Sequence, residues 1–501
     1  MSARSSVLLG LADAVLQPGF EGTAPPAWLR RRLAGGLGGV ALFSRNIEEP
    51  AQVRALVDAM RRENPDVLVA IDEEGGDVTR LEVDHGSSRP GNLALGAVDD
   101  LELTEAVARD IGRDLAAVGV TVNYAPDADV NSNPDNPVIG VRSFGAWSEL
   151  VARHTAAWVR GLQSTGVAAC AKHFPGHGDT GVDSHLALPT VHGTAEDIAL
   201  AALPPFRAAV DAGVKAIMTG HLLVPAYDPA VPATMSPRIL LDLLRGELGF
   251  TGLIITDGIE MRAVADRYGL AGAAVGAIAA GADAICVGGG LADEGTVELL
   301  RTALVDAVMT GDLPEDRLAD AAARVRELAA WTATARTEPV AAAGGEPVGL
   351  VAARRAVRVT VRPGGTLPLP AAPHVVELAP ALHQAIDRGT PWGVAELLAR
   401  LRRGTTAVRL YQGDLEDPEQ VDKAALEPAA GRPLVLVVRD AHRQAWMSAT
   451  LDRLLAARPD AAVVELGVPG PRPLGAIYVA THGAAKVCAD AAAEVLTQKL
   501  A

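Results

Sequence analysis

Residues 167–173 read VAACAKH, a short apolar run that ends in Lys172 and His173. Such a run is typical of a strand buried on both faces of a parallel sheet. Amphipathic segments such as residues 148–163 and 238–248 separate it from similar runs. The seven other runs are VLLGLAD (7–13), GVALFS (39–44), VLVAID (67–72), VTVNYAPDAD (120–129), VKAIMTGH (214–221), LIITD (253–257) and ADAICVG (282–288). Eight strands that alternate with helices predict a (β/α)8 barrel.

Polar residues stand at the ends of five of these runs. They are Asp72, Asp127, Asp129, Lys172, His173, His221 and Asp257. In a barrel the carboxyl ends of the strands meet at one face, where active sites are built from several strands. Any one of these residues could instead cap a helix or form a turn. Their coincidence at five strand ends favours an active site.

A second domain is expected after the barrel. The segment WTATARTEPVAAAGGEPVG (331–349) is typical of a linker. Six further strand-like runs follow, at 356–362, 374–379, 405–412, 433–440, 461–469 and 476–481, with helical segments between them. We therefore predict an α/β fold with a catalytic barrel at 1–335, a linker at 336–352 and a smaller α/β sandwich at 353–501.

The composition excludes several classes of partner. The net charge of -16 argues against nucleic acid, which clustered positive charge would bind. No apolar run is long enough to span a membrane. The start of the chain superficially resembles a signal peptide, but Asp13 interrupts it, so a cytoplasmic protein is expected. The three cysteines, Cys170, Cys286 and Cys488, lie far apart and predict buried thiols.

The loop KHFPGHGDTGVDSHLALP (172–189) concentrates groups that exchange protons. It holds three histidines, two aspartates and a lysine, and its glycines and prolines exclude a helix. His173 and His177 have the spacing of a helical zinc pair, but Pro175 lies between them, so no metal is predicted. The phosphate-binding GxGxxG and GxxxxGK[ST] motifs and the GxSxG serine elbow are also missing. What remains is a constellation of carboxylates and histidines, and no cofactor is expected.

This constellation resembles glycoside hydrolase family 3, in its branch of bacterial β-N-acetylglucosaminidases (β-hexosaminidases). The matching segments, in the order of the family, are AIDEEGGDVTRL (70–81), DVNSNPDNPVIGVRSFG (129–145), the 172–189 loop and LIITDGIEM (253–261). The similarity spans most of residues 5–335, and the 172–189 loop is its most specific part. The second domain resembles the family's α/β sandwich more weakly.

The resemblance implies a retaining mechanism with Asp257 as the nucleophile and with His185 and Asp183 as an acid/base dyad. In an extended loop, side chains two residues apart point to the same side, so Asp183 can bind one ring nitrogen of His185. An aspartate there would favour the imidazolium and bring the pKa of the histidine toward the working pH. The alternatives are a helix cap at Asp257 and a simple polar turn at 183–185.

Other matches imply residues that bind the nonreducing sugar. They are Asp72, Arg142, Lys172 and His173, with His221 expected at the rim. Asn131 and His177 could equally hold loops in shape, and the structural role is favoured for Asp135 and Asn136, as Asx residues beside prolines. Two positions depart from the family: Asp77 replaces an arginine after EGG, and Gly258 replaces an Asp or Ser after the nucleophile. Both could shift substrate preference.

Three functions follow from these residues. The first is an exo-acting β-N-acetylglucosaminidase that acts on muropeptide or chitin-derived fragments, which in the cytoplasm would serve cell-wall recycling. The second is a phosphorylase, because a histidine base repels phosphate less than a carboxylate does. The third is a noncatalytic sugar-binding protein. Each of them has a small carbohydrate as its partner.

Overall fold

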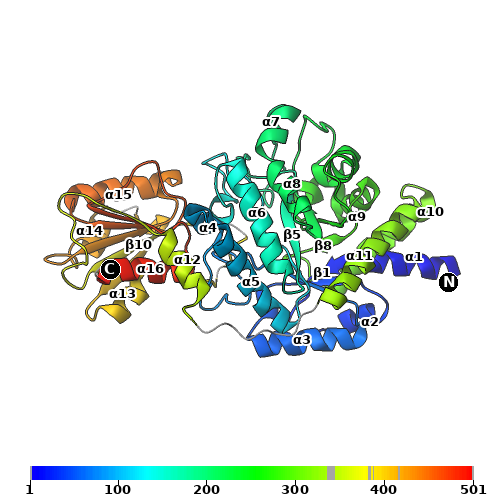
Figure 1. Cartoon of the computed structure of the whole chain (residues 1–501), viewed down its shortest axis with the longest axis horizontal. Helices are drawn as coiled ribbons and strands as arrows, with labels where there is room; N and C mark the ends of the chain where they lie inside the picture. The colour runs from blue at the N-terminus through cyan, green and yellow to red at the C-terminus, as the bar shows by residue number, and fades with distance from the viewer. Residues whose placement is uncertain (1–2, 336–344, 382–384, 388, 416–417, 499–501) are drawn as a thin grey trace. The chain divides into compact units, whose positions relative to one another are not determined.

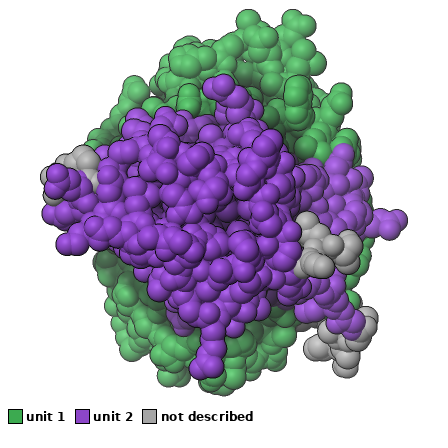
Figure 2. All heavy atoms as spheres, turned by 90° about the vertical axis from the view of Figure 1, so that its left-hand side faces the viewer, with its two compact units in different colours: residues 1–74, 104–139, 145–343 green, residues 75–103, 140–144, 344–501 purple. Residues whose placement is uncertain are grey.

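In the computed structural model, the described residues are 3–335, 345–381, 385–387, 389–415 and 418–498 (Figure 1). They form two compact units, which Figure 2 colours separately. Unit 1 contains residues 1–74, 104–139 and 145–343, and unit 2 contains residues 75–103, 140–144 and 344–501. The domain boundaries expected from the sequence remain a prediction, and residues 336–344 of the expected linker lie outside the described residues.

Unit 1 is a TIM-like barrel. Its strands are β1 (Leu16–Pro18), β2 (Gly39–Leu42), β3 (Leu68–Ile71), β4 (Val122–Asn123), β5 (Ala168–Phe174), β6 (Ala216–Thr219), β7 (Leu253–Thr256) and β8 (Ile285–Val287). Strands β2 to β7 pair in parallel in chain order, and β1 pairs in parallel with β8. Thr256 N–H donates to Ala284 O across β7 and β8 at 3.0 Å, and Gly38 N–H donates to Asp13 O at 3.1 Å, ahead of β2 and β1. These bonds close the ring, so the predicted fold class is confirmed.

Helices follow most of the strands. They are α1 (Ala3–Ala14), α2 (Ala27–Ala34), α3 (Pro50–Glu63), α5 (Leu101–Val118), α6 (Ser148–Gln163), α7 (Ala195–Ala201), α8 (Pro204–Asp211), the π-helix η4 (Arg238–Glu247), α9 (Arg262–Ala280), α10 (Glu294–Thr310) and α11 (Glu315–Ala335), with the 3-10 turns η1 (Ser44–Asn46) and η3 (Ala233–Met235). Among the described helices, none combines the length and the apolar character needed to cross a bilayer.

The prediction of a strand at residues 7–13 is wrong. These residues lie in α1, and the first strand is β1, which begins at Leu16. Leu8 and Ala12 are four residues apart and both fully buried, which is the spacing of one helix face. Leucine and alanine are strong helix formers, and Val7 is the only β-branched residue of the run. Apolarity alone therefore could not separate a buried helix from a buried strand here.

Unit 2 is built around a six-stranded sheet. Its strands are β9 (Arg358–Val361), β10 (His374–Ala379), β11 (Thr406–Tyr411), β12 (Leu434–Val438), β13 (Ala462–Glu465) and β14 (Ile477–Ala480), in the spatial order β11-β10-β12-β13-β14-β9. Only β9 is antiparallel to its neighbour. All six strands fall within the runs identified in the sequence. The parallel strands β10, β12, β13 and β14 are buried, as strands covered on both faces are expected to be, whereas the edge strand β11 is mostly exposed.

Helices cover both faces of this sheet (Figure 1). The remaining elements of unit 2 are α4 (Asn92–Val98), η2 (Gly140–Arg142), α12 (Val348–Ala356), α13 (Ala395–Leu401), η5 (Gln412–Leu415), α14 (Pro418–Ala425), η6 (Ala441–Arg443), α15 (Ala445–Ala457) and α16 (Lys486–Thr497). Leu398 of α13 and Leu496 of α16 belong to the apolar core on one face. Met447 and Leu451 of α15 belong to the core on the other face. The result is the predicted α/β sandwich.

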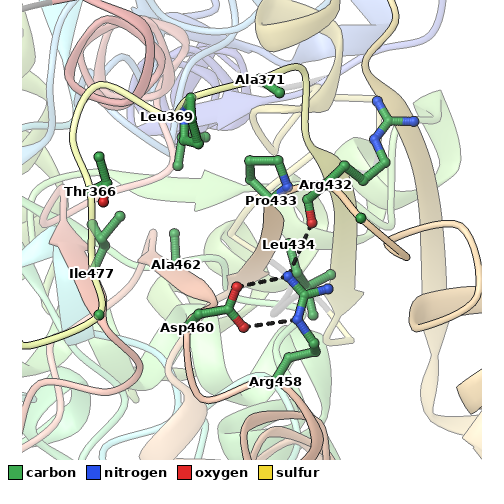
Figure 3. Close-up of a pocket in the computed structure, with 13 residues that line it drawn as sticks. Thr366, Leu369, Ala371, Arg432, Pro433, Leu434, Arg458, Asp460, Ala462 and Ile477 are labelled. Carbon is green, nitrogen blue, oxygen red and sulfur yellow. Dashed lines mark hydrogen bonds and ion pairs between the residues drawn. The ribbon is translucent and has the colours of Figure 1, made fainter.

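A hollow of about 450 Å³ lies beside the sheet of unit 2, next to the amino-terminal ends of β12, β13 and β14 (Figure 3). The charged side chains that line it are hydrogen-bonded to neighbouring residues. Arg458 makes two hydrogen bonds of 2.8 Å to Asp460 and donates to Arg432 O at 3.0 Å. The side chain of Arg432 itself donates to the carbonyl oxygen of Ala372. The hollow therefore presents no constellation of groups that could exchange protons with a ligand.

Residues 75–103 are bound to the C-terminal part of the chain within unit 2. Asp77 Oδ2 lies 2.6 Å from Arg439 Nη2, and its Oδ1 accepts the Ala484 N–H at 2.8 Å. The Asp77 and Arg439 side chains are 2% and 6% exposed, so this ion pair is buried. Elsewhere in the same unit, Arg355 Nη1 lies 2.7 Å from Asp100 Oδ2. The aspartate that departs from the family pattern is thus neutralised by an arginine of the sandwich.

We predict that Asp77→Ala destabilises unit 2 by about 3–5 kcal/mol, because removing one partner leaves the other charge buried. Denaturant unfolding followed by circular dichroism measures this loss. The matched control is Asp422→Ala, which breaks a half-exposed ion pair with Arg453 in the same unit and should cost about 1 kcal/mol or less. Equal losses for the two variants would contradict a special role of the buried pair.

Candidate active site

Three charged side chains continue the inward-facing rows of the barrel. Residues two apart on a strand point to the same side. In β3, β5 and β7 the buried interior rows are Leu68 and Ala70, Ala168 and Cys170, and Leu253 and Ile255, all of which belong to one apolar cluster. The next positions in these rows are Asp72, Lys172 and Asp257. The same alternation that fills the barrel therefore places three charged groups above its apolar core.

Lys172 binds two carboxylates. Its Nζ contacts Asp72 Oδ1 and lies 2.8 Å from Glu74 Oε1. Lys172 and Glu74 side chains are both 3% exposed, while Asp72 is 23% exposed. The buried ammonium and Glu74 therefore hold Asp72 in place, and Asp72 keeps a face toward solvent. Glu74 was not singled out from the sequence, although its position two residues after Asp72 could have suggested it.

Asp129 organises the start of the 172–189 loop. This fully buried carboxylate lies 2.7 Å from His173 Nδ1 and accepts the His177 N–H at 2.6 Å. It also accepts the His173 N–H at 3.3 Å. Burial raises the pKa of Asp129, but His173 and the His177 N–H outweigh it, so the pKa lies below its ordinary value. An ionised Asp129 fixes the proton of His173 on Nδ1 and leaves Nε2 for another partner.

Asp257 stands directly after β7 and is partly exposed. Its Oδ1 accepts the N–H of Gly258 at 2.8 Å. Burial raises the pKa of Asp257, but the imidazoles of His173, His221 and His185 and the Gly258 N–H outweigh it and hold the pKa below its ordinary value. Asp257 is therefore a carboxylate at neutral pH, as a nucleophile must be.

Contrary to the expectation from the sequence, His221 does not lie exposed at the rim, while its predicted role in substrate binding stays a prediction. Its side chain is fully buried, with Nε2 2.9 Å from Gly258 O and Nδ1 2.8 Å from Thr234 Oγ1. Burial lowers its pKa. His221 follows Gly220 just after β6, and through Gly258 O its ring supports the peptide after Asp257.

Asp183 and His185 form the predicted pair. Asp183 Oδ1 lies 2.7 Å from His185 Nδ1 and also accepts the His185 N–H at 2.9 Å. The His185 side chain is 26% exposed and that of Asp183 is 8% exposed. His185 also contributes to the lowered pKa of Asp257, so the dyad and this carboxylate interact electrostatically. The aspartate fixes the Nδ1–H tautomer, which leaves Nε2 of His185 for a reacting group.

The remaining predicted site residues have different surroundings. Arg142 belongs to unit 2, where it ends η2, is 6% exposed, and its carbonyl oxygen accepts the amide of Asn92 at 2.7 Å. Asn136 organises a turn, because its Oδ1 accepts the Val138 and Ile139 N–H groups at 2.9 and 2.8 Å. Unit 1 thus brings together Asp72, Lys172, His173, Asp183, His185 and Asp257.

Asp127, Asp129 and His173 could hold a metal ion by distance, because their ligand atoms lie within 4.8 Å of one another. Both oxygens of Asp129 already accept N–H groups from the loop. A cation there would compete with the bond to the His173 ring. The chemistry of the group therefore fits a hydrogen-bonded anchor, and the expectation of no catalytic metal stays a prediction.

Comparisons with known proteins place this site in a family. Residues 29–328 match the model described as "Glycosyl hydrolase family 3 N terminal domain". The chain is 36% identical over 317 residues to "Beta-hexosaminidase A" of Pseudoalteromonas piscicida, in a match that covers 58% of this chain and 53% of that protein. It is 38% identical over 279 residues to a "Beta-hexosaminidase" of Alkalilimnicola ehrlichii, covering 54% of this chain and 79% of the relative. The chain thus spans about half the length of the first relative.

Solved structures agree over a longer range. A glycoside hydrolase family 3 β-N-acetylglucosaminidase from Paenibacillus sp. superposes with a TM-score of 0.84 at 32% identity, covering 100% of this chain and 97% of that one. A β-glucoside phosphorylase superposes with a TM-score of 0.77 at 18% identity, covering 100% and 96%. At this lower identity, the likeness shows a common fold alone.

We predict that Lys172→Met, which removes the ammonium between two carboxylates, lowers stability more at pH 8 than at pH 5. Without the lysine, burial and the charge of Asp72 raise the folded-state pKa of Glu74. A raised carboxyl pKa favours folding below the unfolded pKa of about 4.3 and loses that contribution as pH rises. Thermal unfolding of wild type and variant at both pH values gives the two differences. A deficit that is larger at pH 5 would contradict this account.

Proposed function

Because the chain belongs to glycosyl hydrolase family 3, we propose that it is a retaining, exo-acting β-N-acetylglucosaminidase. Its substrates would be muropeptide or chitin-derived fragments with a terminal N-acetylglucosamine. The observation that carries this proposal is the combination of the Asp257 carboxylate directly after β7 with a partly exposed His185 whose Nδ1 lies 2.7 Å from Asp183 Oδ1. The β-hexosaminidase relatives and the Paenibacillus structure support the substrate class.

In the first step, a carboxylate oxygen of Asp257 attacks the anomeric carbon while the bond to the leaving oxygen breaks. The end of β7 supplies a fixed position, and the Gly258 N–H orients the carboxylate. Its lowered pKa keeps it ionised without a base beside it. The product of this step is a glycosyl ester on Asp257, with the configuration at the anomeric carbon inverted.

His185 carries the proton in both steps. Its Nε2–H protonates the departing oxygen in the first step, which leaves a neutral imidazole. In the second step Nε2 removes a proton from water, the water oxygen bonds to the anomeric carbon, and Asp257 is released. Asp183 stabilises the imidazolium before the first step and after the second, so one histidine serves as both acid and base.

The other charged groups would bind the sugar. Asp72 can accept hydrogen bonds from hydroxyl groups, while Lys172 and the Nε2 side of His173 can contact neighbouring oxygens, and a charged partner strengthens such bonds. Arg142 keeps the sugar-binding role that the resemblance implies. A cytoplasmic location and a role in cell-wall recycling remain predictions from the sequence.

We predict that Asp257→Ala abolishes release of p-nitrophenol from its β-N-acetylglucosaminide, since no other group would form the ester. An activated 2-fluoro glycoside should add one glycosyl unit to the wild-type protein, which mass spectrometry of the peptides would locate on Asp257. Thermal unfolding of the variant checks that it is folded. Turnover by Asp257→Ala at the wild-type rate, or an adduct elsewhere, would refute this assignment.

Product analysis tests the phosphorylase alternative, which a histidine base leaves chemically open. We predict free N-acetylglucosamine as the product even in phosphate buffer. Anion-exchange chromatography would separate it from the 1-phosphate. Formation of the sugar 1-phosphate as the main product would establish transfer, and binding of the sugar by calorimetry with no turnover of any aryl glycoside would establish the noncatalytic alternative.

A further inference from the structure

His177 is the buried centre of the loop that carries the dyad, yet no step of the proposed chemistry uses it. Its ring is 1% exposed. The backbone N–H donates to Asp129, and its carbonyl accepts the amide of Asn136 at 2.9 Å. Nδ1 lies 2.7 Å from Thr180 Oγ1, and Nε2 lies 3.1 Å from Ser184 Oγ. Every polar atom of this histidine therefore contacts another part of the loop or its support.

The hydroxyl of Thr180 determines which ring nitrogen of His177 carries the proton. It donates to His177 O at 2.9 Å, and a hydroxyl has only one proton to give. Thr180 Oγ1 must then accept from Nδ1–H of His177. In a neutral imidazole the other nitrogen is an acceptor, so Nε2 accepts the hydroxyl proton of Ser184. Burial, with a smaller effect of His173, lowers the pKa of His177 to about 4, which keeps this neutral form at neutral pH.

Ser184 lies between the two members of the dyad. Asp183 binds the ring and the N–H of His185, and its carbonyl oxygen accepts the N–H of Leu186 at 3.0 Å, which closes a tight turn. The bond from Ser184 Oγ to His177 Nε2 ties this turn to the residues that Asp129 fixes. We propose that His177 is a positioning residue, which holds the acid/base dyad in register with Asp257 through the hydroxyl of Ser184. This inference rests on the proposed function.

A second attachment of the same loop provides a control. Ser132 Oγ donates to Asp179 Oδ1 at 3.1 Å on the exposed side. Removing either serine hydroxyl deletes one side-chain bond to the loop, but only Ser184 adjoins the dyad. If activity depends on the anchoring of the loop in general, both Ser184→Ala and Ser132→Ala should lose activity. If it depends on the position of the dyad, only Ser184→Ala should lose activity.

The test compares Ser184→Ala with wild type on two aryl β-N-acetylglucosaminides. The phenyl glycoside needs a proton on its leaving group and should lose about 10–100-fold in kcat/KM, a part of the 10²–10⁴-fold that general acid catalysis provides. The 2,4-dinitrophenyl glycoside leaves without a proton and should keep kcat/KM within about threefold of wild type. Its kcat should fall, because the second step needs the base, and added azide should restore kcat with formation of the glycosyl azide.

Four further variants sharpen the result. Ser184→Thr keeps the hydroxyl and should retain most activity on the phenyl glycoside. His177→Gln places an amide near the position of Nε2, so its kcat/KM should fall only slightly. His177→Asn reaches only the position of Nδ1, so it should show the same leaving-group dependence as Ser184→Ala. Ser132→Ala should match wild type on both substrates.

The outcomes separate this inference from the proposed function. Wild-type protein that turns over neither glycoside overturns both. Wild-type turnover with Ser184→Ala unchanged, or reduced equally on the two glycosides, overturns the positioning role and leaves the proposed function standing. The same leaving-group dependence in Ser132→Ala also overturns it, because the effect would then belong to the whole loop.

Discussion

The carboxylate of Asp129 accepts N–H groups from both ends of the segment 173–177, and much of the site depends on this interaction. The bond to the His173 ring sets the tautomer of a predicted sugar contact. The bond to the His177 N–H fixes the residue that in turn binds the dyad turn through Ser184. An interior carboxylate is costly to bury unless it is satisfied, and these donors satisfy it. One buried charge therefore connects a barrel strand with the irregular loop that follows it.

Periodicity accounts for the parts that the sequence predicted well. Strands β5 and β7 are apolar up to their ends, so Lys172 and Asp257 were recognisable at the active face before the structure. The six strands of the sandwich were also recognisable from their apolar runs. The first strand was missed because a helix rich in leucine and alanine and a buried strand share the same apolarity. The burial of His221 was not predicted, because a polar residue after a strand can be covered by segments distant in sequence, here those of Thr234 and Gly258.

The buried supports were beyond prediction because they join residues that are distant in sequence or are held by the backbone. The pair of Asp77 and Arg439 depends on the folding of the 75–103 segment onto the sandwich, which no local pattern encodes. Gly258 is a similar case. A Cβ at this position would lie 3.2 Å from Glu260 Oε1, and burial raises the pKa of Glu260. At Asp77 the charge that departs from the family pattern is neutralised locally, and at Gly258 the absence of a Cβ leaves room for the Glu260 carboxylate.

The two reacting groups are supported in different ways, and the difference follows from what each must do. Asp257 ends a short strand above an apolar core, where its position is fixed by the barrel and by the Gly258 N–H. Precise placement suits a group that forms a bond to carbon. His185 instead lies on a loop and is partly exposed, and in the proposed mechanism it exchanges protons with a leaving group and then with water. A loop leaves room for both the leaving group and water, provided that other residues hold its dyad in a fixed position. The ionised Asp129 holds His177 from below, and the bond between His177 and Ser184 joins two neutral groups, so no further charge is placed beside the dyad.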